Sequence, residues 1–196
     1  MIIKKFNHVE LRGEVVSAPT KGNDIFWETA IVVPRDYCDK TDIIPVFVRD
    51  TAMTPVEQLR VGRHVNLQGE MYSRKVMTPT GPFRKSGALA CELDFDPNLG
   101  VGYCHGNYVQ LEGTLVGEPR AKRGEKMTSF NLDISQTQDR GIIMPCEAYR
   151  NCHAQRLAGV GEKATIGIIG SLRTHYRCAF DARVVNASAS DLKILS

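Results

Sequence analysis

The 196-residue sequence has no long hydrophobic run and none of the common motifs of enzymes. Its apolar runs fall far short of the roughly 20 residues that a membrane-spanning helix needs, which excludes such a helix. The first residues include two lysines but no apolar segment or cleavage site of a secretory signal, so we expect a cytoplasmic protein. No phosphate-binding glycine loop, nucleophile elbow or zinc-protease helix is present, so we expect neither an enzyme nor a cofactor.

The six cysteines form no C-x-x-C pair. In a chain without a secretory signal, scattered cysteines indicate reduced thiols rather than a disulfide framework. The residues that come nearest to a zinc pattern follow no common ligand spacing, so we expect no metal. They are Cys104-His105, Cys152-His153, His175 and Cys178.

The chain also has little net charge, because its 25 basic and 22 acidic residues nearly balance and give a formal net charge of +3. Residues 1–96 contain 13 basic and 13 acidic residues, whereas residues 97–196 contain 12 and 9. The second half therefore holds the whole excess, and any surface that binds a polyanion is asymmetric.

The sequence does contain an internal repeat with an offset near one hundred residues. Residues 7–19 and 107–119 both read Asn-x-Val-x-Leu-x-Gly-x-(Val/Leu)-Val-x-x-Pro. This alternation predicts a strand with one apolar face in each copy. The apolar face holds Val9 and Leu11 in the first copy, and Val109 and Leu111 in the second. A glycine in mid-strand suits a bulge or sharp bend, at Gly13 and Gly113.

Three further strands match in order with an offset of 101, and a last alternating segment closes each copy. Residues 54–60 and 152–157 allow a short helix between the third and fourth strands. Five curved strands with a helix in this place describe the OB-fold, and a duplicated β-sandwich is the alternative. We therefore expect an all-β protein of two tandem OB-folds, which are five-stranded Greek-key barrels. The expected domains are 1–96 and 106–196, with 97–105 as the linker.

Residues 7–19 and 59–74 resemble the first strand and the fourth-strand hairpin of bacterial single-stranded DNA-binding proteins. Primosomal replication protein N has a similar opening pattern. The resemblance implies single-stranded DNA as the ligand, with RNA as the alternative, and a role in replication, recombination or repair. It further implies a homodimer with four barrels and replication proteins as partners.

The sequence departs from that family at the positions whose aromatic side chains stack on bases. The aligned residues are Ile43, Arg49 and Val76 in the first copy, and Arg150 and Arg177 in the second. An arginine plane can stack on a base and pair with phosphate, so Arg49 and Arg150 are candidates. The sequence ends at Ser196 without an acidic tip, so we expect no recruitment of partners through a tail.

Basic and aromatic residues between the fourth and fifth strands of the first copy give the main candidate site. Single-strand binding needs positive charge together with flat side chains. This connection of about fifteen residues is longer than a structural link requires, and a solvated hairpin is the alternative interpretation. Its candidates are Tyr72, Arg74, Lys75, Phe83, Arg84 and Lys85.

The second copy offers Arg173, Tyr176 and Arg177 at the matching turn. It also has a basic run after its first strand, with Arg120, Lys122 and Arg123 as candidates for phosphate contact. A solvated turn is the alternative interpretation of that run.

The alternation of the strands does not decide whether two aromatic side chains lie in the core or on the binding face. Trp27 shares parity with Ile31 and Val33, which favours the core over base stacking. Phe47 shares parity with Arg49 and lies either on the outer binding face or in the core.

The leading hypothesis is a single-stranded DNA-binding protein with little sequence preference. The alternative is an OB-fold module for protein interactions in a replication-restart or conjugation complex, with weak or no DNA binding. The missing stacking residues and the near-neutral first half fit this alternative.

Overall fold

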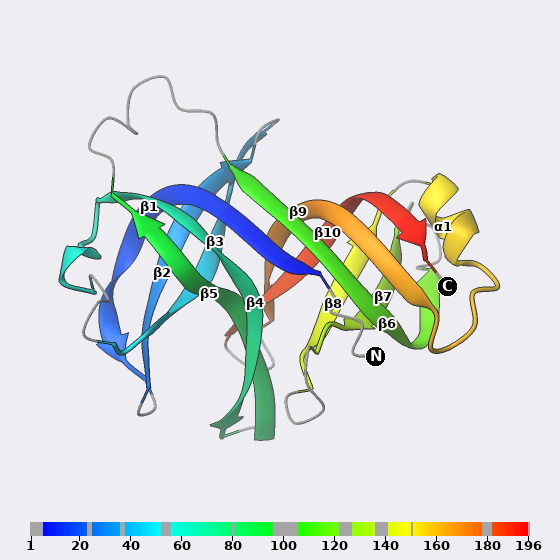
Figure 1. Ribbon diagram of the computed structural model, residues 1–196, viewed down its shortest axis with the longest axis horizontal. Helices are drawn as coiled ribbons and strands as arrows, with labels where there is room; N and C mark the ends of the chain where they lie inside the picture. The colour runs from blue at the N-terminus through cyan, green and yellow to red at the C-terminus, as the bar shows by residue number, and fades with distance from the viewer. Residues whose placement is uncertain are drawn as a thin grey trace. The chain divides into compact units, whose positions relative to one another are not determined.

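The computed structural model is built almost entirely of β-strands (Figure 1). Ten strands, one 3₁₀-helix and one α-helix make up the part of the chain that the structure describes. No helix in this part is long and apolar enough to cross a membrane. The described residues are 6–22, 25–35, 38–51, 56–79, 81–95, 106–121, 127–135, 141–149, 151–177 and 182–195.

The first barrel has the strand order β2-β3-β5-β4-β1, and a further pairing between β2 and β1 closes it. β3 and β5 pair in parallel, whereas β1 pairs with β2 and β4, and β2 with β3, in antiparallel fashion. The short helix follows the third strand, as the sequence predicted. The elements are β1 (Asn7–Lys21), β2 (Phe26–Arg35), β3 (Cys38–Arg49), η1 (Val56–Gln58), β4 (His64–Thr78) and β5 (Gly81–Asp94).

The second barrel repeats this arrangement with the order β6-β7-β8-β10-β9, closed by the pairing of β6 with β9. β8 and β10 form the parallel pair. Its elements are β6 (Asn107–Ala121), β7 (Thr128–Asp133), β8 (Ile143–Ala148), α1 (Asn151–Leu157), β9 (Thr165–Arg177) and β10 (Ala182–Ile194). Each copy is thus a closed five-stranded barrel with a helix after its third strand, which confirms the predicted pair of OB-folds.

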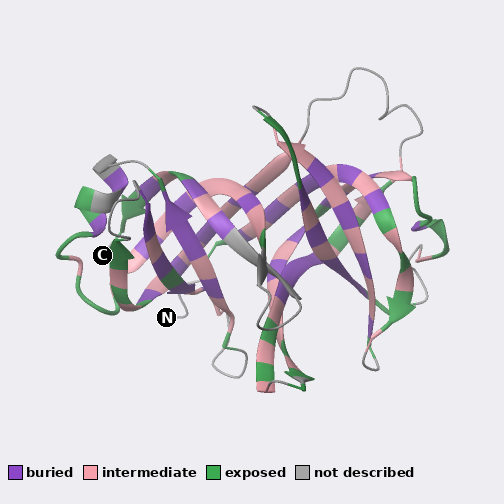
Figure 2. Ribbon diagram, turned by 180° about the vertical axis from the view of Figure 1, so that it is seen from behind, coloured by how far each residue is buried: buried purple, intermediate pink, exposed green. Residues whose placement is uncertain are grey.

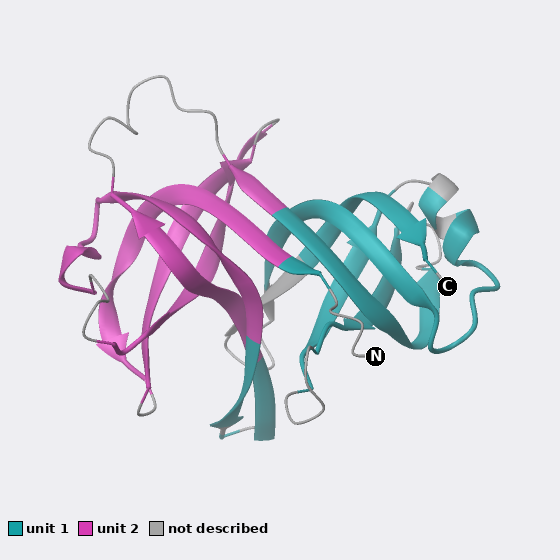
Figure 3. Ribbon diagram, viewed as in Figure 1, with its two compact units in different colours: residues 1–7, 73–84, 109–196 teal, residues 8–72, 85–108 magenta. Residues whose placement is uncertain are grey.

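The chain groups into two compact units (Figure 3). One unit consists of residues 8–72 and 85–108, and therefore contains most of the first barrel. The other consists of residues 1–7, 73–84 and 109–196, and contains most of the second barrel. The tip of the β4–β5 hairpin belongs to this second unit, although its strands continue those of the first barrel.

Alternate side chains along the strands fill the two barrel interiors (Figure 2). Val9 and Leu11 of β1 are fully buried, and so are Val109 and Leu111 of β6. The predicted apolar face of each first strand is therefore confirmed. Burial of such side chains contributes about 1.5–3 kcal/mol each relative to exposure, which makes these interiors the main stabilising feature.

Gly13 is required by a close approach of β1 to β2, and not by a bulge. A Cβ atom at Gly13 would overlap the carbonyl oxygen of Val32. Gly13 itself pairs regularly with Val65, whereas the register of β1 shifts only after Val15. Of the two interpretations, a bulge or a sharp bend, the bulge is therefore wrong, because the strand passes a neighbouring backbone where no side chain fits.

Gly113 has the matching position in the second barrel. A Cβ atom there would lie 2.9 Å from the carbonyl oxygen of Asp133. It pairs regularly with Ile166, and the register of β6 with β7 shifts only after Val116. The same physical reason applies to both copies.

Candidate nucleic-acid interface

One outward face of the first barrel gathers several side chains that the sequence singled out. Val46 and Val48 of β3 are buried in the interior, so Phe47 between them points outward. Phe47 lies opposite Glu28 of β2 and beside Leu89 of β5 in the strand register. We call this surface the first outer face, and it comprises Phe26, Glu28, Phe47, Arg49, Tyr72, Lys85 and Leu89.

An aromatic cluster occupies the middle of the first outer face. Phe26, Phe47 and Leu89 are buried in it. The ring of Tyr72 packs on both phenylalanines, with centroid separations of 5.2 Å to Phe26 and 5.3 Å to Phe47. Tyr72 is only partly buried, whereas the other three residues are buried, so it is the most accessible residue of the cluster. Phe47 thus lies on the outer face and is nevertheless fully buried, because residues of three other strands surround it.

Two cations flank this cluster. Arg49 is exposed and lies opposite Phe26 in the register of β2 and β3. Lys85 donates from Nζ to Oε2 of Glu28 at 2.6 Å, and the Glu28 side chain is only 11% exposed. The carboxylate therefore offsets the charge of Lys85. Arg49 is the more exposed of the two residues.

Cys91 lies two residues beyond Leu89 on β5 and is exposed. Partial burial raises the pKa of its thiol above 9.0, and the charge of Glu70 acts in the same direction. Arg49 opposes both effects by favouring the thiolate. The thiol therefore responds to the electrostatic environment of the first outer face.

The predicted loop between the fourth and fifth strands is instead an extended hairpin. β4 continues to Thr78 and β5 begins at Gly81, so the backbone groups pair with each other along most of this segment. Pairing of the two strands satisfies the hydrogen-bonding groups of the backbone even where the hairpin has no buried apolar face. Without such a face there is no apolar alternation, so the sequence pattern did not reveal the strands. Four candidates lie on the hairpin, with Lys75 and Arg84 exposed, and with Arg74 and Phe83 partly buried.

Arg84 donates from a terminal guanidinium nitrogen to the carbonyl oxygen of Gly141 at 2.8 Å. One of its donors is therefore already used within its own compact unit. Lys75 is likewise exposed and is a candidate for contact with a phosphate.

The matching face of the second barrel is polar. Glu147 of β8 is buried, lies opposite Ser129 of β7 and accepts a hydrogen bond of 2.7 Å from the phenol of Tyr149. Nε2 of His175 lies 3.5 Å from the same carboxylate oxygen. Arg173, a sequence candidate, is on β9 and partly buried. We call this surface the second outer face; it comprises Ser129, Glu147, Tyr149, Arg173, His175 and Ser188.

The remaining sequence candidates are placed only in part. Arg120 is exposed near the end of β6, opposite Ser129. Tyr176 and Arg177 belong to the end of β9, where the structure describes the backbone alone. Lys122, Arg123 and Arg150 lie outside the described residues.

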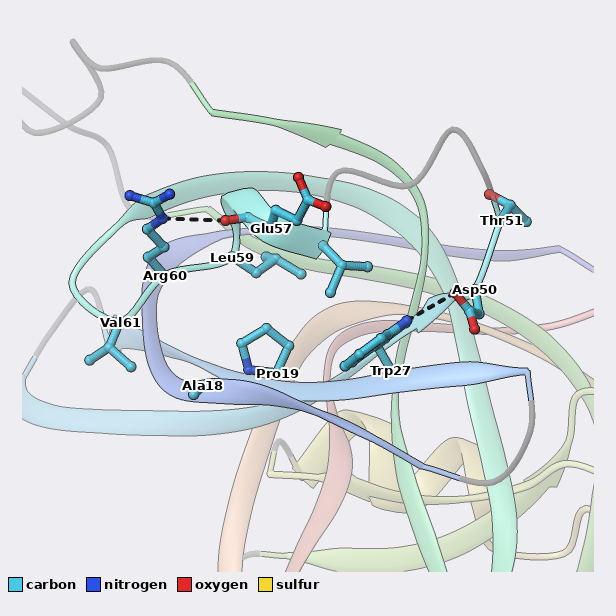
Figure 4. A pocket seen from close by; sticks show the side chains of 10 residues that line it. Ala18, Pro19, Trp27, Asp50, Thr51, Glu57, Leu59, Arg60 and Val61 are labelled. Carbon is cyan, nitrogen blue, oxygen red and sulfur yellow. Dashed lines mark hydrogen bonds between the residues drawn. The ribbon is translucent and has the colours of Figure 1, made fainter.

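An open pocket of about 700 Å³ lies in the first barrel between the end of β1 and η1 (Figure 4). Trp27 forms one wall, and its indole N–H donates to Asp50 at 3.1 Å. Lys21 lies 2.9 Å from the Asp50 carboxylate and 5.8 Å from the Trp27 ring centre. The favoured core position for Trp27 is therefore wrong, because the residue has interior parity but is the second residue of β2 and lines the open pocket.

Among the described residues, no three His, Cys, Asp or Glu side chains lie close enough together to hold a metal ion. Cys38 and Cys91 are exposed free thiols, and Cys146 is a buried one. Burial strongly raises the pKa of Cys146, so it is held as a neutral thiol. Of the six residues that come nearest to a zinc pattern, the side chains of Cys104, His105, Cys152 and Cys178 lie outside the described part.

The fold and the two outer faces define a tandem OB-fold protein. Among solved structures, the chain is similar to the wild-type single-stranded DNA binding protein from Thermus aquaticus, with a TM-score of 0.78 and 15% identity. That similarity covers 98% of this chain and 94% of the other. A deletion mutant of the same protein gives a TM-score of 0.72 at 16% identity, over 97% of this chain and 95% of its own.

No protein-family model matches the chain, and no curated protein matches it in sequence. The structural similarity therefore shows a shared fold. It confirms, at the level of the fold, the resemblance that the repeated strand pattern indicated.

Proposed function

We propose that this protein binds single-stranded DNA with little sequence preference and acts in DNA replication, recombination or repair. The observation that carries the proposal is the Tyr72 ring, accessible on a buried aromatic cluster and near the exposed Arg49. Every base has a flat π-face, so stacking on a ring tolerates any sequence, while a guanidinium attracts phosphate. The fold shared with single-stranded DNA binding proteins supports the same proposal.

The proposal includes the organisation expected from the sequence. Residues 1–96 and 106–196 would each be one domain, and two chains would supply four barrels in a homodimer. Arg74, Lys75, Phe83 and Arg84 of the hairpin remain candidates for contact with DNA, and the protein acts by binding rather than by catalysis. Sedimentation of the purified chain tests the dimer independently of DNA.

A salt titration of oligo(dT) binding, followed by fluorescence anisotropy of a labelled oligonucleotide, tests the function directly. Binding at about 50 mM salt should weaken steeply toward about 200 mM, because phosphate contacts release counterions. No binding at about 50 mM salt would overturn the proposal and favour the protein-interaction alternative.

A matched pair of variants locates the contact. Arg49→Ala removes an exposed cation from the first outer face, and the logarithmic salt slope should fall by about 0.7. Arg60→Ala removes an exposed cation of the same barrel beside the Trp27 pocket and should leave the slope unchanged. Equal effects of the two variants would contradict a contact at the first outer face.

A further inference from the structure

The two outer faces differ at matching positions of the repeat. In the first barrel, Phe47 of β3 lies beside Leu89 of β5. In the second barrel, the same parallel register places Glu147 of β8 beside Ser188 of β10. A phenyl ring with an aliphatic neighbour is thus replaced by a carboxylate with a hydroxyl neighbour.

The fourth strands differ in the same sense. β4 pairs with β1 in the register in which β9 pairs with β6, and Gly69 and Gly170 lie at matching positions. Three residues further along, Tyr72 corresponds to Arg173. The accessible ring of the first outer face therefore has a guanidinium in its place on the second.

Glu147 makes the second face unsuitable as a surface for a stacked base. Glu147 is only 8% exposed. Its carboxylate accepts a hydrogen bond from the Tyr149 hydroxyl and lies 3.5 Å from Nε2 of His175. A buried carboxylate depends on such partners, and a base lying on it would have to displace them. A carboxylate at this position also disfavours the approach of a phosphate.

We propose that bases stack on the first outer face and not on the second, so that each chain offers one stacking face with Tyr72 as its ring. This inference rests on the proposed function and specifies which copy performs the stacking. At the position of the Tyr72 ring the second face has Arg173, and its exposed Tyr149 ring donates its hydroxyl to Glu147 instead of lying on an apolar cluster of the kind that supports stacking on the first face. The second barrel contributes phosphate contacts, for which Arg120 is exposed.

Two tryptophan reporters, each replacing a native tyrosine of one outer face, test the inference. Trp27 is the only tryptophan of the chain, so a Trp27→Phe background leaves a single tryptophan in each reporter. Tyr72→Trp on the first face and Tyr149→Trp on the second are then each titrated with oligo(dT), and tryptophan emission and oligonucleotide anisotropy are recorded together. Stacking should quench the emission of Tyr72→Trp at least about fivefold more than that of Tyr149→Trp.

A measurement on the unaltered chain keeps the test decisive if a reporter fails to fold. Oligonucleotides that contain 5-iodouracil are bound, irradiated and mapped by mass spectrometry. Cross-links should form at Tyr72 and its neighbours on the first outer face. Cross-links at Tyr149 or His175 would overturn the inference.

The outcomes separate this inference from the proposed function. Oligonucleotide binding with equal quenching at the two reporter positions overturns the single stacking face and leaves DNA binding intact. Absence of any anisotropy change with the unaltered chain overturns the proposed function itself. Binding with quenching and cross-links confined to the first outer face supports both.

Discussion

Lys85 and Glu28 form an ion pair on the first outer face, with Nζ 2.6 Å from Oε2. Glu28 lies opposite Phe47, so its charge is next to the aromatic cluster on which we propose that bases stack. Because this carboxylate offsets a cation and repels phosphate, Glu28→Gln should strengthen oligo(dT) binding and steepen the salt slope by about 0.7. Anisotropy titrations at several salt concentrations measure both quantities.

Glu57→Gln provides the matched control, because Glu57 is an exposed acidic residue of η1 in the same barrel. Its removal should leave both affinity and slope unchanged. Weaker binding by Glu28→Gln would contradict the placement of DNA on the first outer face.

The thiol of Cys91 reports on occupancy of the same face. Cys91 is exposed and senses Arg49 and Glu70, and the raised pKa predicts slow alkylation at neutral pH. Saturating oligo(dT) should slow its alkylation by N-ethylmaleimide further, whereas Cys38, exposed at the start of β3, should react equally with and without oligonucleotide. Mass spectrometry of the labelled peptides gives the two rates, and equal protection of both cysteines would contradict the prediction.

The Trp27 pocket has its own pH dependence. Hydrogen bonds from Lys21 and Trp27 lower the pKa of Asp50 below its ordinary value of 3.8. The carboxylate therefore holds both partners at every pH above 3.8, and this contribution is lost as the pH falls through the lowered pKa. We expect a change in Trp27 emission below pH 3.8, measured by fluorescence while far-UV circular dichroism follows global unfolding.

Asp50→Asn is the control for this transition. The amide of the variant does not titrate. The Trp27 emission of Asp50→Asn should therefore stay constant over the pH range in which the circular dichroism of the variant and of the unaltered protein is unchanged. An identical acid transition in Asp50→Asn would show that another group is responsible.

The sequence was sufficient to predict the barrels because their strands alternate with a period of two and repeat in order. Val9 and Val109 occupy the same position in both copies, and both are buried. Gly13 was identified as special, but the reason for the glycine was not predictable, since the carbonyl that excludes a side chain belongs to Val32, on another strand.

The candidate site was only partly predictable, because it depends on contacts between residues far apart in the chain. Tyr72 and Arg49 were identified by type, but the sequence did not show that Phe26 and Leu89 support the tyrosine ring. The alternation of β2, in which Phe26 and Glu28 share a face, could have placed both on the outer side. The pairing of Glu28 with Lys85, 57 residues away, had no sequence signal.

Gly69 couples the barrel wall to the first outer face. A Cβ atom at Gly69 would overlap the carbonyl oxygen of Leu89, whose side chain supports the aromatic cluster. Gly69→Ala should therefore lower the free energy of unfolding by about 1–3 kcal/mol and weaken oligo(dT) binding, since β5 must shift. Gly141→Ala, with no atom within 4 Å of its Cβ position, should change stability by less than about 0.5 kcal/mol in the same urea titrations. Equal stability of the two variants would contradict the close approach of β4 to β5 on which the support of Tyr72 depends.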